Sequence, residues 1–137
     1  HDYLPKKLDG NVVELGSGFG ALAIPVAKCL QENPMIAYEI SLIPYLVSKI
    51  FQFFFPQKNL IIERKDFFDV NLSHSKLIIC YLYPAAMAKL KFKFEKELKN
   101  ETYLISNTFA IPGWEPISTI TLDDIYKTKI YLYKYVR

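Results

Sequence analysis

The sequence predicts one α/β domain built on a doubly wound, mostly parallel sheet that ends in an antiparallel strand pair. Short apolar runs alternate with longer segments of helical period along most of the 137 residues. A glycine-rich turn joins the first apolar run to the first helical segment. After residue 111 the helical period disappears, and two strand-like runs follow proline and glycine breaks. We expect residues 1–137 to form this single domain.

The first half of the chain predicts three strands and two helices. Residues 11–15, 35–39 and 60–63 are short apolar runs typical of buried strands. The first helix is expected over residues 21–31, and the second begins at Ser41, a typical N-cap residue, and ends at Pro56. The side chains of the second helix expected to face the core are Ile43, Leu46, Val47, Ile50, Phe51 and Phe54.

The second half predicts two more parallel strands, one helix and the terminal pair. Strands are expected over residues 77–81 and 103–106, and Pro84 opens the helix between them. Met87, Leu90, Phe94 and Leu98 are expected to face the core, and Lys89, Lys93, Lys96 and Lys99 to face water. Residues 117–122 and 129–136 follow as two strands joined by a polar turn.

Composition excludes several functional classes. The net charge of +3 arises from 17 basic and 14 acidic residues spread along the chain, so electrostatics do not demand a nucleic-acid partner. Cys29 and Cys80 are isolated, which excludes a disulfide framework and a zinc site, and we expect no metal and a reducing, cytoplasmic compartment. The apolar run over residues 40–55 is interrupted by polar residues and falls short of a membrane span. Because the chain opens at His1, we expect its natural N-terminus, with any anchor or targeting segment, to be missing.

The glycine-rich turn is the first candidate binding element. Gly16, Ser17, Gly18 and Gly20 lie between a strand and a helix, where glycines let the backbone approach a ligand and the helix N–H groups point at it. Gly16, Gly18 and Ala21 also fit the dinucleotide pattern G-x-G-x-x-A, and a tight turn without a ligand is a further alternative.

Acidic residues near the ends of three strands sharpen this prediction. Glu14 lies just before the turn, where its carboxylate can receive the ammonium of an amino-acid-like ligand that NAD lacks. Glu39 ends the second strand, where it can accept hydrogen bonds from two ribose hydroxyls. Asp66 follows the third strand and can accept an adenine amino group, while the Phe67 ring can cover the base. Phe67 or Phe68 as a plain core residue is the alternative.

The stretch Val12-Val13-Glu14-Leu15-Gly16-Ser17-Gly18-Phe19-Gly20 resembles the first motif of class I methyltransferases. The segments at 79–84 and 106–114 resemble the protein-lysine methyltransferases of the ATP synthase c-subunit and the adenine nucleotide translocase, with their prokaryotic and archaeal relatives. The resemblance implies a seven-stranded Rossmann-like fold, S-adenosylmethionine as cofactor and a protein lysine as acceptor. A membrane-associated substrate is compatible with it.

The same resemblance directs attention to residues after the fourth and fifth strands. The Asn/Asp-Pro-Pro-Tyr box of enzymes that methylate planar amines is replaced here by Tyr81-Leu82-Tyr83-Pro84. We expect Tyr81, which also borders the cofactor, and Tyr83 to position the acceptor amine through their ring faces and hydroxyls. Packing under the rim of the sheet is the alternative for both tyrosines.

Pro84, Asn107 and Trp114 are expected on the substrate side, although Trp114 alternatively plugs the sheet edge. Two further hypotheses stay open from the sequence, namely a nicotinamide-dependent oxidoreductase and a non-catalytic methyltransferase-fold binding module.

Overall fold

Seven strands join in one sheet in the computed structural model, which describes residues 8–136. In spatial order they are β3 (Leu60–Glu63), β2 (Met35–Tyr38), β1 (Asn11–Leu15), β4 (Ser75–Cys80), β5 (Thr102–Asn107), β7 (Lys129–Tyr135) and β6 (Ser118–Thr121). The first five run parallel, and β7 pairs antiparallel with both β5 and β6. The predicted doubly wound sheet with a terminal antiparallel pair is therefore confirmed, with strand ends within about two residues of those expected.

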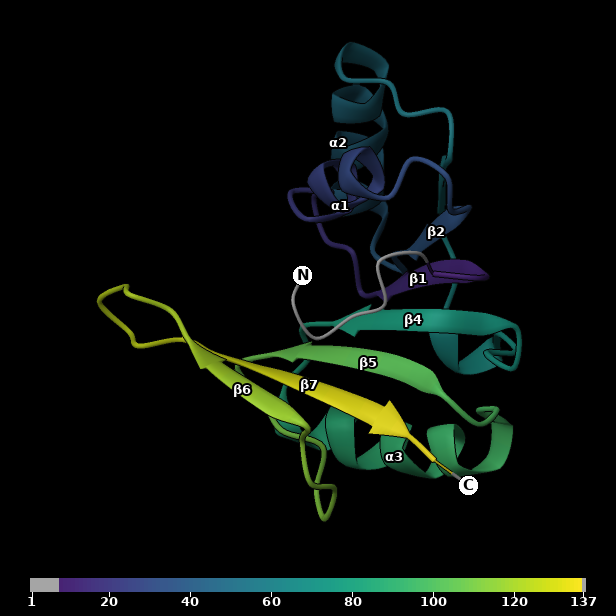
Figure 1. Ribbon diagram of the computed structural model, residues 1–137. Helices are drawn as coiled ribbons and strands as arrows, with labels where there is room; N and C mark the ends of the chain where they lie inside the picture. The colour runs from purple at the N-terminus through teal and green to yellow at the C-terminus, as the bar shows by residue number, and fades with distance from the viewer. Residues whose placement is uncertain (1–7, 137) are drawn as a thin grey trace.

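Helices cover both faces of this sheet. The helices α1 (Ala23–Cys29) and α2 (Leu42–Phe54) lie beside β1 and β2, and α3 (Pro84–Glu97) lies on the other side beneath β5 and β7 (Figure 1). A single 3-10 turn, η1 (Phe67–Asp69), follows β3. Alternate residues of β1 belong to two hydrophobic cores, one on each face of the sheet, because successive strand side chains point to opposite faces. Val12 packs with α1, whereas Val13 and Leu15 pack with α3.

The α3 core follows the predicted helical pattern. Met87, Leu90 and Phe94 are buried on one side of α3, and Leu98 is buried just after it. One lysine departs from the prediction. Lys93 is mostly covered, since its Nζ donates to the Phe68 carbonyl at 3.1 Å and pairs with Glu97 at 2.6 Å. This side chain therefore joins α3 to the η1 turn instead of facing water.

The prediction of which side of α2 faces the core was wrong. Its only buried residue is Ser48, and nearly all of the side chains expected in the core are exposed. The cause is a close approach to the glycine turn, because a Cβ on Gly20 would lie 3.0 Å from Ser48 Cβ. A small residue is needed on that side, so the bulky side chains point away from the sheet. The expected Ser41 side-chain cap is also absent, and the Glu39 carboxylate accepts from the Ser41 N–H instead.

Candidate active site

The candidate site lies where the parallel strands end. Parallel strands present their carboxyl ends at one rim, and open α/β sheets bind ligands outside that rim. The loops after β1, β2, β3, β4 and β5 therefore meet there, and they carry most of the residues singled out from the sequence. Among the residues that the structure describes, no cluster of His, Cys, Asp or Glu could hold a metal ion.

The glycine turn is held open by backbone geometry. Gly16, Gly18 and Gly20 all have positive φ, at 72°, 57° and 84°. The N–H groups of Gly16 and Ser17 both donate to the Tyr38 carbonyl at 3.0 Å, which ties the turn to β2. A Cβ on Gly18 would meet no atom within 4 Å, so the backbone there faces open space. A ligand can thus approach the Gly18 backbone closely.

Glu39 connects the turn to the start of α2. Its Oε1 accepts from the Gly18 N–H at 2.8 Å, and its Oε2 accepts from the Ser41 N–H at 2.9 Å. One carboxylate thus fixes the tip of the turn and caps a helix N-terminus, where a negative charge is favoured. Each oxygen keeps a further lone pair for a ligand hydroxyl.

Glu14 is buried without a hydrogen-bond partner for its Oε2. Burial, and secondarily the nearby Glu39 carboxylate, raises the pKa of Glu14 from 4.5 to about 8. An unpartnered buried carboxyl is costly for a fold, and perturbed groups of this kind gather at functional sites. The Ser17 hydroxyl in the adjoining turn is also buried and unpartnered. Two orphaned polar groups therefore lie at the base of the turn.

Asp66 and Phe67 occupy the next position along the rim. The Asp66 Oδ1 accepts from the Phe68 N–H at 3.0 Å and caps the η1 turn. Phe67 is partly buried, and its ring approaches to 4.0 Å of a Cβ placed on Gly16. The structure thus brings Phe67 next to the glycine turn, and Phe68 turns toward α3, where Lys89 Nζ lies 4.3 Å from its ring centroid.

The loops after β4 and β5 bring aromatic rings to the rim, two of them exposed. Tyr81 directly follows β4 and stacks on Phe109, with ring centroids 6.4 Å apart and planes 14° apart. Tyr83 is exposed at the N-cap of α3, next to Pro84. The Asn107 side chain ends β5 and accepts from the Thr108 hydroxyl at 2.9 Å.

Trp114 lies away from this group. Its ring packs against Phe94 of α3 and stacks on Tyr135 at 5.4 Å, and its Nε1 donates to Glu95 at 3.3 Å. Tyr135 pairs with Thr102, the first residue of β5, so Trp114 lies toward the opposite end of the parallel strands. The structure does not bring it together with the glycine turn.

Two rim residues were missed from the sequence. Leu82 lies 2.9 Å from a Cβ placed on Gly16, so it packs beneath the turn, and no local pattern signals this contact. Phe109 stacks on Tyr81, and its position just after β5 could have indicated it. Cys80, at the end of β4, is unsuited to nucleophilic chemistry, because burial raises the pKa of its thiol to about 12.

Comparisons with known proteins agree with this geometry. Residues 14–118 match the family model of the ANTKMT methyltransferase domain. A protein-lysine N-methyltransferase of the archaeon Saccharolobus islandicus (strain REY15A) is 31% identical, over 91% of this chain and 79% of the relative. The adenine nucleotide translocase lysine N-methyltransferase of Mus musculus is 26% identical, over 81% of this chain, which spans only 48% of that relative.

Solved structures of other proteins resemble this chain in fold. An RNA methyltransferase from Salinibacter ruber, in complex with S-adenosyl-L-homocysteine, superposes with a TM-score of 0.83 at 20% identity. The match covers 93% of this chain and 82% of that chain. At this identity the likeness shows a shared sheet topology and helix placement.

Proposed function

Because the chain belongs to the ANTKMT methyltransferase domain family, we propose that it transfers a methyl group from S-adenosylmethionine to the side-chain amine of a lysine in a protein. The names of the archaeal and mouse relatives support the lysine acceptor. A single structural observation carries the choice of cofactor, namely the buried, unpartnered Glu14 carboxyl at the base of an open glycine turn.

Glu14 fits an amino-acid-like ligand. An ammonium placed against Oε2 supplies the missing partner and favours the ionised carboxylate, which lowers the pKa of Glu14 toward its ordinary value. The buried Ser17 hydroxyl offers one more donor or acceptor to the same part of the ligand. NAD has no ammonium, so this pair of orphaned groups favours S-adenosylmethionine over a nicotinamide cofactor.

Glu39, Asp66 and Phe67 complete the cofactor side of the site. Glu39 already binds two backbone N–H groups and keeps lone pairs for ribose hydroxyls. The Asp66 Oδ1 is taken by the Phe68 N–H, which leaves Oδ2 to accept the adenine amino group. Phe67 lies close enough to Gly16 for its ring to cover the base.

The bound cofactor supplies a methyl group on a positively charged sulfur. Transfer would join this methyl group to the lysine nitrogen through the amine lone pair, and the electron pair of the broken S–C bond would remain on sulfur. Tyr81 and Tyr83 have exposed rings, and the partly buried Phe109 ring stacks on Tyr81. These ring faces attract the lysine cation and align it. A lysine amine has a pKa of about 10.4, so the site must also let a proton leave to water before attack.

On the substrate side, we place Pro84 and Asn107 beside the two tyrosines, since Pro84 follows β4 as the tyrosines do and Asn107 ends the neighbouring parallel strand β5. Trp114 is left out of this acceptor site, because its ring fills the space between α3 and β7. The two described cysteines are free thiols, which agrees with a reducing compartment such as the cytoplasm.

The decisive experiment measures binding and transfer separately. Calorimetry should detect S-adenosylhomocysteine binding by the full-length protein, and incubation with radiolabelled S-adenosylmethionine and a lysate from its source should label a lysine. Glu39→Ala should abolish labelling, because it frees both the turn and the start of α2. Lys93→Ala removes contacts to Phe68 and Glu97 but neither contact of Glu39, so it should leave labelling largely intact.

Two results would overturn parts of this function. Failure of the intact protein to bind S-adenosylhomocysteine would exclude the proposed methyltransferase site. Binding without transfer to any lysine would instead indicate a non-catalytic module that keeps the methyltransferase fold.

A further inference from the structure

The α2 helix is amphipathic, but its polar side faces the sheet and its apolar side faces outward. Viewed along its axis at 100° per residue, the polar or small residues Tyr45, Ser48 and Gln52 lie on the side facing the sheet. Gln52 Nε2 donates to the Leu60 carbonyl at 2.8 Å, and Ser48 packs against Gly20. The opposite half of the helix is apolar and faces outward, with no described residue burying it.

We define the outer α2 face as the exposed apolar side chains of this helix and of the residue that follows it. They are Leu42, Ile43, Leu46, Ile50, Phe51, Phe53, Phe54 and Phe55. Phe53 is 79% exposed and Phe54 is 68% exposed. A contiguous apolar surface of this kind is rare on a monomeric protein and marks an interaction surface.

Charge favours one class of partner for this face. Residues 40–62 contain Lys49 and Lys58 and no Asp or Glu. Both lysines are exposed, one within the helix and one just beyond its end. Glu39 and Glu63 border this segment, and the Glu39 carboxylate is bound by the Gly18 and Ser41 N–H groups. A helix face whose own charged residues are lysines matches a bilayer with anionic headgroups, because the alkyl stems can lie on the apolar layer while the ammonium groups reach phosphate.

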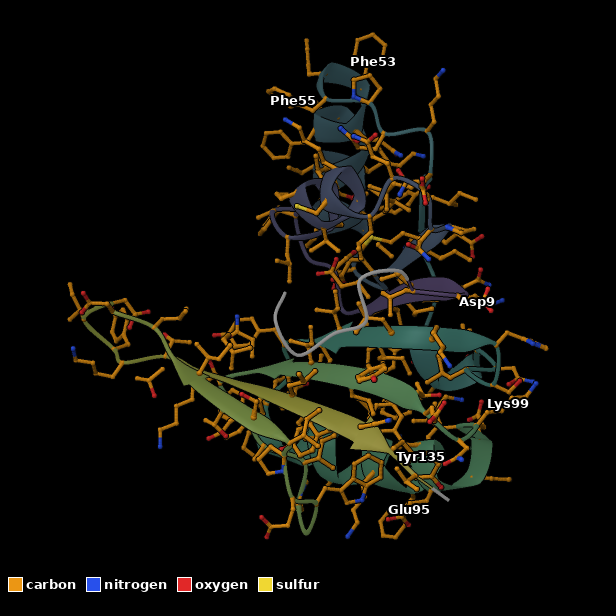
Figure 2. The ribbon with its side chains drawn as sticks, viewed as in Figure 1. Asp9, Phe53, Phe55, Glu95, Lys99 and Tyr135 are labelled. Carbon is orange, nitrogen blue, oxygen red and sulfur yellow. The ribbon has the colours of Figure 1, made fainter. Side chains whose placement is uncertain are left out.

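Shape favours the same partner. The outer α2 face is a ridge at the edge of the molecule, and Figure 2 shows Phe53 and Phe55 at the end of α2 farthest from β4, β5 and β7. The Phe53 and Phe54 rings meet edge to face, with centroids 5.4 Å apart and planes at 87°, so their faces point in different directions. A fluid acyl layer accommodates such splayed rings without a complementary pocket.

We propose that the outer α2 face docks on an anionic lipid bilayer, with the helix lying along the membrane surface. About 20 Å of helix is long enough to lie in the interface and too short to span it. In agreement, none of the helices within residues 8–136 is long and apolar enough to cross a membrane. Because α2 begins three residues after Glu39, docking also places the rim of the candidate site near the lipid headgroups.

The test uses flotation of the full-length protein with vesicles. The wild type should float with phosphatidylcholine–phosphatidylserine vesicles. The double variant Phe53→Ser/Phe54→Ser should lower the partition coefficient about tenfold or more, because each ring loses its apolar burial. Phe92→Ser is the matched control, since Phe92 is 70% exposed on α3, and its partition should not change.

A charge variant separates the electrostatic contribution to docking from the apolar one. Lys49→Glu/Lys58→Glu should weaken binding to anionic vesicles and leave the weaker binding to pure phosphatidylcholine unchanged. Thermal unfolding of each variant checks that the fold is intact without relying on cofactor binding. Docking does not depend on the proposed methyl transfer, so either result can fail alone.

Three outcomes would overturn the docking. They are absence of the wild type from the floating fraction, equal flotation of the wild type and the Phe53→Ser/Phe54→Ser variant, and self-association that this variant abolishes while no protein binds vesicles. The last result would assign the outer α2 face to contacts between copies of the chain.

Discussion

The helices α2 and α3 have nearly the same length, 13 and 14 residues, and lie on opposite faces of the sheet, yet they point their apolar sides in opposite directions. In α3, Met87, Leu90 and Phe94 are buried, while Lys89 and Lys96 are exposed. In α2, Ser48 is buried and the phenylalanines are exposed. An apolar helix stripe therefore indicates that something covers it, and only the packing shows whether that partner is the protein's own sheet.

The largest effect on stability should be the difference between truncating a phenylalanine in α3 and truncating one in α2. Phe94→Ala removes a fully buried ring and should lower the free energy of unfolding by about 3–5 kcal/mol. Phe53→Ala removes an exposed ring and should change it by less than about 0.5 kcal/mol. Urea denaturation measures both. Similar losses for the two variants would show that α2 packs inward in solution.

The next effect concerns the pH dependence of the site that α2 borders. The pKa of Glu14 is raised in the folded state to about 8, so the stability contributed by its protonated form is present below pH 4.5 and lost as the pH rises through 8. Relative to Glu14→Gln, the unliganded wild type should lose roughly 3 kcal/mol between pH 5 and pH 8. Urea unfolding of both proteins at several pH values tests this, and parallel pH curves would refute the buried, unpartnered carboxyl.

A smaller effect tests the inverted packing of α2 directly. Ser48→Leu places a large side chain against Gly20 and should destabilise the fold by about 1–3 kcal/mol through overpacking. It should also weaken S-adenosylhomocysteine binding, since it displaces the glycine turn. Ile50→Ser, on the outer α2 face, should leave both thermal stability and binding nearly unchanged. The opposite ranking would mean that the polar side of α2 faces water.

The smallest effect concerns the lysine that the structure partly buries on α3. Lys93→Ala removes the ion pair with Glu97 and the hydrogen bond to the Phe68 carbonyl, and should cost about 0.5–1 kcal/mol. Lys96→Ala, at an exposed position of the same helix, should cost close to nothing. Equal unfolding midpoints for the two variants would place Lys93 in solvent.

The placement of the glycine turn and its two glutamates in the candidate site was predictable, because it depends on short segments. The order apolar strand, glycine turn, helix is written in consecutive residues, and Glu14 and Glu39 take their places from the strands that carry them. The partners of these carboxylates were not predictable. That Glu39 would bind the Gly18 and Ser41 N–H groups, and that Glu14 would stay unpartnered, depends on how two loops meet.

By itself, the sequence determined the alternation of strands and helices, the strand pair at the end and the glycine turn, since periodicity and turn residues act over a few positions. Only the tertiary structure decided the direction of α2 and the location of Trp114. Both depend on contacts between residues far apart in the chain, namely Gly20 with Ser48, and Trp114 with Phe94 and Tyr135. A one-dimensional pattern can show that a face must be covered, but the three-dimensional packing selects what covers it.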